Sequence, residues 1–289
     1  MHIPQEMLTG PICPVTATVA GITLAAAAGW AYKRRIDSII DASKEVSGDE
    51  LRKTVYSAIK QGTLKFLGVT AIIFVLQALN FPIWHGISGH FIGGVLAAAI
   101  LGIPGGIISM ATVLAIQAFC LGDGGIDALG ANILNMGIVG AGVGGLIRLG
   151  LNKLGLNNLV STGIAAFCGL VLAVLTLDAE LAICGKGTMD VFKHLMFAHL
   201  PLAVIEAFIA AGLYALLTRD LRQPSLRFSV ATASVIVVIA GVLLLFPGKS
   251  ELPDGLEWTD EECKLTATDA NTGETTSEEA TPVKATQQL

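Results

Sequence analysis

Charged side chains are scarce in this sequence. Only 14% of its 289 residues are Asp, Glu, Lys or Arg, whereas 53% are hydrophobic. Soluble domains carry about 25% charged residues. This balance excludes an ordinary soluble domain and indicates a helical protein that crosses the membrane several times.

Cysteine motifs and nucleotide-binding loops are also missing. No two cysteines have the CxxC spacing of a metal site, and apolar filler within helices is the simpler interpretation for Cys120 and Cys168. The five cysteines are Cys13, Cys120, Cys168, Cys184 and Cys263. The sequence has no GxxxxGK[ST] loop, so ATP binding by that route is not expected.

The formal net charge of −5 arises at the C-terminus. Residues 249–289 contain 10 of the 23 acidic residues and only 3 of the 18 Lys and Arg residues. From residue 259 onward the sequence lacks apolar periodicity, which predicts a disordered acidic tail over 259–289. The acidity therefore says nothing about a cationic substrate in the apolar part.

Eight apolar segments are candidates for membrane-spanning helices, which need about 20 apolar residues each. They are 15–32, 64–81, 90–103, 105–121, 131–148, 158–177, 195–217 and 228–246. The third and fourth are short and separated only by Gly102–Gly106, so we expect a tight hairpin with its tip buried in protein. The predicted fold class is an all-α polytopic bundle of about eight transmembrane helices, or seven if this pair is a single element.

The Lys and Arg residues define the orientation. If eight spans alternate, the basic islands all fall on one side, which the positive-inside rule assigns to the cytoplasm. The islands contain Lys33, Arg34, Arg35, Arg52, Lys53, Lys60, Lys65, Arg148, Lys153, Arg219, Arg222 and Arg227. We therefore expect both termini outside a prokaryotic cell membrane, with residues 33–62 as an amphipathic cytoplasmic excursion on the membrane surface or against a partner.

Three polar stretches share the expected outer side. They are the N-terminal segment, "NFPIWHGISGH" at 80–90 and "LGDGGIDALGANILNM" at 121–136. No basic stretch precedes the first span as in a signal peptide, so we expect residues 1–14 to be retained. Polar loops are usually solvated connectors, but three that meet at one face indicate a site.

The N-terminal "MH" has the chemistry of a metal chelator. A free amine on Met1, the amide nitrogen of His2 and Nδ1 of His2 can bind one ion in a plane, and His90 is the best-placed fourth ligand. A square of nitrogens favours Ni(II) or Cu(II), with Co(II) as an alternative, whereas zinc prefers a tetrahedral site. Because the nitrogens must lose protons to bind, capture should weaken as the pH falls.

Several motifs in order carry a family resemblance. "MHIP" at the start, "NFPIWHGISGHFIGGVLAAAILG" at 80–102, "GDGGIDALGANILNMGIVG" at 122–140 and "HLPLAVIEAFI" at 199–209 resemble the CbiM/NikM family. These are cobalt- or nickel-binding S components of energy-coupling-factor transporters. The resemblance covers about residues 1–217 and implies that Met1, His2 and His90 hold the metal. "PDGLEW" at 253–258 is similar to the PDGLE module of accessory subunits in these systems.

The resemblance also implies the organisation and the partners. We expect a metal-binding membrane domain over 1–217, an additional transmembrane helix with the PDGLE segment over 218–258, and the tail. Co(II) or Ni(II) is then a transported substrate, with no permanent cofactor. A transmembrane coupling subunit, separate ATPase subunits and membrane lipid are the expected partners, and nucleic acid is not. A metal-ion channel or secondary transporter is the alternative function. A membrane enzyme is the weakest hypothesis, because the sequence contains no recognisable acid–base pair or nucleophile arrangement.

Further polar residues have competing interpretations. His85, Asn132 and Asn135 are candidates for orienting the ligands, with the two asparagines bracing the N-terminal segment. His194 and His199 open the seventh span, where interfacial or interhelical hydrogen bonding is the simpler role. Glu206 is an intramembrane carboxylate, either functional or a structural acid with a partner.

Small residues form two rows that allow close helix contact. Internal packing is the simpler interpretation for both rows. For the row at residues 21–29, the family resemblance also suggests that it docks on the coupling subunit. The rows are Gly21, Ala25 and Gly29, and Gly137, Gly140 and Gly144.

Overall fold

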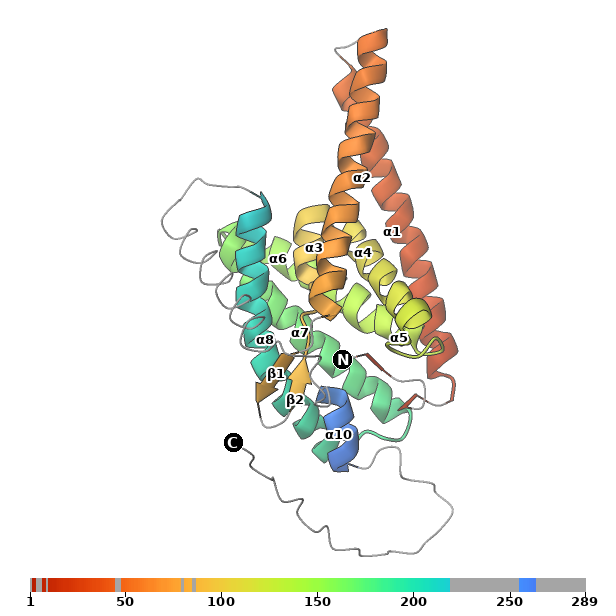
Figure 1. The fold of residues 1–289 in the computed structure, drawn as a ribbon, viewed down its shortest axis with the longest axis vertical. Helices are drawn as coiled ribbons and strands as arrows, with labels where there is room; N and C mark the ends of the chain where they lie inside the picture. The colour runs from red at the N-terminus through yellow and green to blue at the C-terminus, as the bar shows by residue number, and fades with distance from the viewer. Residues whose placement is uncertain are drawn as a thin grey trace, which may run out of the picture.

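The protein is a bundle of long helices with a two-helix projection at one end (Figure 1). This computed structural model describes residues 2–3, 7–8, 10–44, 48–78, 81–84, 87–218 and 255–263. Six helices in these ranges are long and apolar enough to cross a membrane. The expected all-α polytopic class is confirmed, and the chain is a multi-pass membrane protein.

The helical elements follow the apolar segments closely. Those up to residue 132 are α1 (Ile12–Ser43), α2 (Asp49–Ala78), α3 (Gly94–Leu101), α4 (Ile103–Ile116), the π-helical η2 (Gln117–Leu121) and α5 (Leu129–Asn132). Those after it are the π-helical η3 (Ile133–Val143), α6 (Gly144–Lys153), α7 (Asn158–Ile183), α8 (Met189–Thr218) and α10 (Gly255–Cys263). The predicted span 228–246 lies outside the described residues.

A short antiparallel hairpin interrupts the helical pattern in the segment expected to be a polar loop. Strands β1 (Phe81–Trp84) and β2 (Ile87–Gly89) pair in a register that places Phe81 opposite Gly89 and Pro82 opposite Ser88. Because His90 follows β2 directly, the hairpin determines where that residue enters the bundle.

The expected third and fourth spans do form a helical pair. Gly102 separates them with φ +80°, a conformation that glycine adopts without the strain of other residues. The helices touch closely, because a Cβ at Gly106 would lie 2.6 Å from the backbone nitrogen of Ala98. The hairpin tip at Gly102 is only half-buried, so the expectation of a buried tip is wrong. With eight residues, α3 is too short to cross a membrane alone.

Residues 33–43 and 49–62 are helical, as expected, but they project from the bundle. Figure 1 shows that α1 and α2 continue along their own axes and project from the bundle as a hairpin. The α1 sequence from residue 31 to residue 43 contains neither Gly nor Pro, so nothing breaks its backbone hydrogen-bond pattern there.

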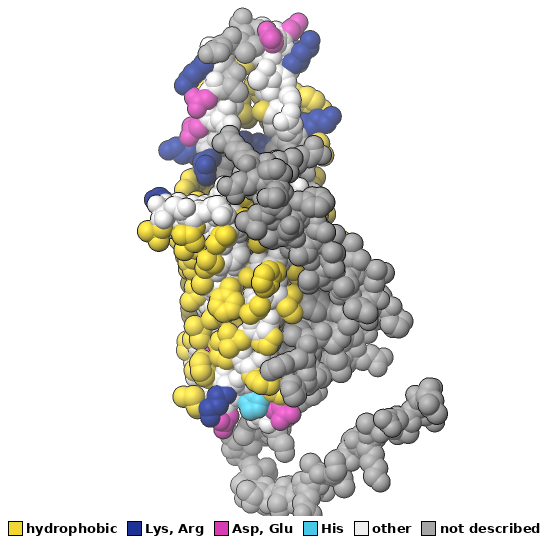
Figure 2. All heavy atoms as spheres, turned by 90° about the vertical axis from the view of Figure 1, so that its left-hand side faces the viewer, with side chains coloured by type: hydrophobic (Ala, Val, Ile, Leu, Met, Phe, Trp, Pro, Cys, Tyr) yellow, Lys and Arg dark blue, Asp and Glu magenta, His cyan; other side chains and the backbone are white. Residues whose placement is uncertain are grey.

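Charges and apolar side chains occupy different levels of the molecule. Figure 2 shows hydrophobic side chains over the middle of one face, and Lys, Arg, Asp and Glu side chains on the projecting hairpin above them. The N-terminal segment, the β1–β2 hairpin and α10 all lie at the opposite end from that hairpin (Figure 1). We call that opposite end the site end.

The C-terminal helix extends into the stretch that the sequence predicts to be disordered. α10 continues to Cys263, so residues 259–263 are helical. Leu256 and Thr259, three residues apart on one helical face, are both fully buried, and this packing orders a segment rich in acidic residues. Residues 264–289 lie outside the described residues.

Candidate functional site

The N-terminal segment is tucked into the bundle through its backbone. The amide of Ile3 donates to Oδ1 of Asn132 at 2.9 Å, and the carbonyl oxygen of Ile3 accepts from the amide of Gly125 at 3.2 Å. The Ile3 side chain is fully buried. Two satisfied backbone groups and one buried side chain therefore fix the residue that follows His2.

His2 and His90 come together at the site end. The two imidazole rings are stacked, with centroids 4.9 Å apart and planes inclined by 22°. Both residues are buried, with 7% of His2 and 6% of His90 exposed. The fold thus juxtaposes the two histidines that the sequence predicts as ligands.

Two polar side chains flank the His2 ring. Its Nε2 lies 3.2 Å from Oε1 of Gln117, and its Nδ1 lies 3.2 Å from Oδ1 of Asp123. An amide oxygen only accepts hydrogen bonds, so Nε2 carries the hydrogen in this contact. Nδ1 then faces a carboxylate, which favours positive charge there, as either a ring proton or a bound cation.

The turn that carries Asp123 approaches the N-terminal segment closely. The amide of Asp123 donates to the carbonyl oxygen of Gln117 at 3.1 Å. Gly124 has φ +79°, and a Cβ there would lie 3.0 Å from Nδ2 of Asn132 and 3.4 Å from Cβ of His2. Glycine at this position therefore supplies both the backbone conformation and the space that His2 needs.

The backbone after His90 is anchored by an acid from α8. Oε2 of Glu206 accepts from the amide of Ile92 at 3.0 Å, and Oε1 accepts from the amide of Gly93 at 2.9 Å. Glu206 is buried, and both carboxylate oxygens have a partner. Of the two interpretations that the sequence allows for Glu206, this geometry favours the structural one: it positions the loop that presents His90.

Sequence reasoning missed three polar residues that contribute to this arrangement. Gln77 donates from Nε2 to the carbonyl oxygen of Ile92 at 2.6 Å, and Gln117 contacts His2. Glu180 accepts from Nδ2 of Asn135 at 2.8 Å, so Asn135 binds this acid from α7, whereas Asn132 contacts the N-terminal segment. A polar residue within a predicted apolar span is the signal that could have found Gln77 and Gln117, whereas Glu180 lies just after the span predicted over 158–177.

The other candidate residues either lie on α8 or are outside the described residues. Met1 and His85 are not among the described residues. Nδ1 of His199 is 2.8 Å from the carbonyl oxygen of Leu195, and Nδ1 of His194 is 2.7 Å from that of Asp190, so both of these contacts lie within α8.

The described part of the chain contains no cluster of three or more His, Cys, Asp or Glu side chains with metal-binding geometry. Within those residues, His2 and His90 are not joined by a third side chain of these types in such a cluster.

Comparisons with known proteins agree on one family. The family model for the CbiM cobalt uptake substrate-specific transmembrane region matches residues 2–224. A fused nickel transport protein NikMN of Rhodobacter capsulatus is 30% identical over 241 residues, covering 76% of this chain and 62% of that protein. A putative fused nickel transport protein NikMN of Archaeoglobus fulgidus is 35% identical over 147 residues, and the match covers 50% of this chain and 49% of that relative.

Solved structures show the same architecture. A crystal structure of a truncated transition metal transporter superposes with a TM-score of 0.61 at 30% identity, covering 76% of this chain and 99% of that one. A second transition metal transporter structure gives the same TM-score at 29% identity. The family match spans most of the sequence and includes both histidines at the site end, and the chain therefore belongs to the CbiM family of cobalt uptake substrate-specific transmembrane regions.

Proposed function

We propose that this protein is the substrate-capture subunit of an ATP-driven importer of the energy-coupling-factor type, for Co(II) or Ni(II). The observation that carries the proposal is the buried contact of His2 with His90, on an N-terminal segment that Asn132 holds in place. Family membership supports metal uptake, and the relatives named above are nickel transport proteins.

The proposed metal site combines backbone and side-chain nitrogens. The Met1 amine, the amide nitrogen and Nδ1 of His2, and a ring nitrogen of His90 form the ligand set. Gln117 keeps the hydrogen of the His2 ring on Nε2 and so leaves Nδ1 for the ion. The carboxylate of Asp123, 3.2 Å from Nδ1, would then stabilise the positive charge of the metal.

The surface of α1 supports a transmembrane partner. Gly21, Ala25 and Gly29 lie four residues apart and are all exposed, and a Cβ at either glycine would meet nothing within 4 Å. In the second small-residue row, by contrast, a Cβ at Gly144 would lie 2.5 Å from Cγ2 of Val95, so this row packs internally. The α1 row suits close approach of a helix from the coupling subunit.

The decisive experiment measures Co(II) and Ni(II) binding by the purified protein with a native N-terminus. His2→Ala and His90→Ala should each abolish binding while the protein still inserts and unfolds at the temperature of the wild type. Asp127→Ala is the matched control, because Asp127 is an exposed acid of the same outer stretch. Undiminished affinity in His2→Ala would rule the site out.

A flux assay separates the importer from the channel or secondary transporter. A site that holds its ion through several nitrogen bonds opposes rapid release. In liposomes, the protein alone should bind metal yet pass little, and flux should begin when the coupling and ATPase subunits are added with ATP. Rapid flux through the protein alone would favour a channel.

A further inference from the structure

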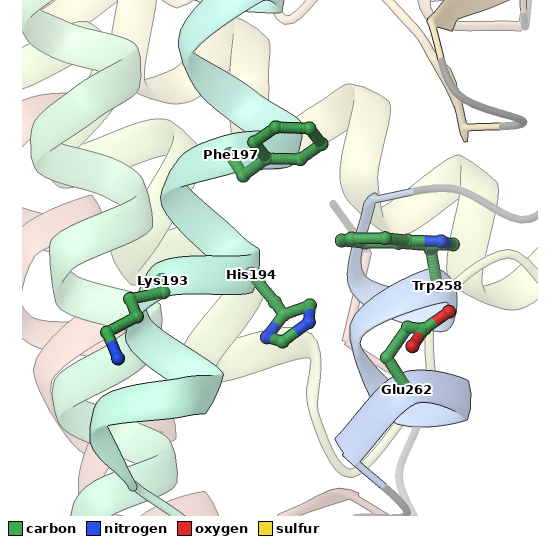
Figure 3. A pocket seen from close by; sticks show the side chains of 5 residues that line it. All are labelled: Lys193, His194, Phe197, Trp258 and Glu262. Atoms are coloured by element: carbon green, nitrogen blue, oxygen red, sulfur yellow. The ribbon is translucent and has the colours of Figure 1, made fainter.

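The helix α10 covers part of the site end. It packs against the N-terminal half of α8 and against β2. Figure 1 places it below the β1–β2 hairpin, and Figure 3 shows its Trp258 on the side that faces His194 and Phe197 of α8. α10 therefore contacts the strand that leads directly into His90.

One face of α10 is firmly docked. Leu256 and Thr259 are both fully buried. Leu256 belongs to the same hydrophobic cluster as Ile3, which follows His2, and Val191 and Leu195 of α8. Burial of a leucine side chain contributes about 1.5–3 kcal/mol, which is enough to hold a short helix in place and small enough to be overcome.

The other face of α10 is loosely packed. The Trp258 ring lies 5.2 Å from the ring of His194 and 5.9 Å from that of Phe197, and Sγ of Cys263 is 3.6 Å from Nδ1 of His194. Around these contacts lies an open cavity of about 490 Å³, and Lys193 and Glu262 complete its lining (Figure 3). Because α10 is buried on one face and incompletely packed on the other, it can separate from α8 without unfolding the bundle.

Access to the metal site requires some such movement. His2 and His90 are 7% and 6% exposed, so an ion from outside does not reach both rings in this arrangement. We propose that α10 is a cap over the metal site, formed by this chain itself. When α10 is docked on α8, it keeps the segments that carry His2 and His90 in the closed arrangement. When α10 is released, the site opens to Co(II) or Ni(II). This inference rests on the proposed function and adds the element that controls exchange of the ion.

A reversible disulfide tests the cap. In a protein with Cys13, Cys120, Cys168 and Cys184 replaced by alanine, His194→Cys places a second thiol beside the native Cys263. Oxidation should lock α10 onto α8. Stopped-flow kinetics measure the rates of metal uptake and of metal release into a chelator. Both rates should fall about tenfold or more, because the rate of exchange through a minor open state is proportional to the population of that state. Reduction should restore both rates, and the equilibrium affinity should change little.

A loosening variant gives the opposite effect without a disulfide. Leu256→Ala removes the buried anchor and should speed both uptake and release, whereas Glu257→Ala on the exposed face of α10 should leave them unchanged. If the oxidised disulfide variant, the reduced variant, Leu256→Ala and the wild type all bind metal and exchange it at equal rates, the proposal that α10 is a cap is wrong. That result would indicate that the ion enters past the half-exposed Asp123. If the wild type binds no metal at all, the proposed site itself fails and the cap with it.

Discussion

The site end and the projecting α1–α2 hairpin are built on different principles. At the site end, buried polar groups from distant parts of the chain bind each other, as Gln117 does with His2 and Glu206 with Ile92. The hairpin has exposed charges and local contacts, such as the ion pair of Lys44 with Asp41, three residues apart, at 2.7 Å. Only 22% and 17% of the most apolar stretches of α1 and α2 are buried, against 56% for the span that contains α4.

This difference matches the two tasks that the proposed function assigns to the protein. Buried polar pairs are costly to break, because each lost partner leaves a desolvated group behind, so they fix geometry. The exposed apolar surface of α1 and α2 is available to lipid and to a partner subunit. We therefore expect changes at the site end to alter metal binding, and changes on α1 to alter assembly.

Blocking the N-terminal amine should have the largest effect. A residue or tag placed ahead of Met1 converts the amine into an amide, which cannot complete the proposed chelate. Metal binding measured by calorimetry should disappear, whereas the same tag placed after Leu289 should leave it intact. Equal affinity in the two proteins would exclude the amine as a ligand.

Enlarging the small row on α1 should abolish assembly and leave the metal site unchanged. Gly21→Leu with Gly29→Leu adds bulk on a surface where the protein itself has open space, so folding should be unaffected. The coupling subunit should no longer copurify. Gly150→Leu on α6, where a Cβ also meets nothing within 4 Å, is the control. Copurification of the double variant at the wild-type level would place the docking surface elsewhere.

Replacing Gln117 should weaken metal binding without abolishing it. Gln117→Ala removes the acceptor that keeps the hydrogen on Nε2 of His2. Loss of a group that orients a metal ligand typically reduces affinity about 10–100-fold. Titration with Co(II) measures the change, and Gln61→Ala, at an exposed glutamine of α2, should bind as the wild type does. A wild-type affinity in Gln117→Ala would show that the ring is oriented in another way.

The smallest effect should come from the tip of the hairpin. Lys44 and Asp41 are 67% and 70% exposed. An exposed ion pair contributes about 0–1 kcal/mol, so Lys44→Ala should shift neither the thermal unfolding midpoint nor the metal affinity measurably. A large fall in the unfolding midpoint or in the metal affinity would mean that the hairpin is coupled to the site end and that the two regions do not act separately.

The sequence by itself determined the helical class, most of the helices and the pair of histidines. These follow from local signals: an apolar run of sufficient length favours a membrane-spanning helix, and the motifs "MHIP" and "SGH" each contain one of the two histidines. The helical nature of 33–43 and 49–62 was equally local, although the direction of these segments away from the bundle was not.

Only the tertiary structure decided which polar groups meet. Asn132 and Asn135 are three residues apart, yet one contacts Ile3 and the other Glu180, because the helix packs its neighbouring turns against different segments. The docking of α10 likewise depends on the surface that α8 and β2 offer to Leu256, a residue in an otherwise acidic stretch. Helix formation is set within a few turns of chain, whereas a buried hydrogen bond needs two partners that packing alone brings together.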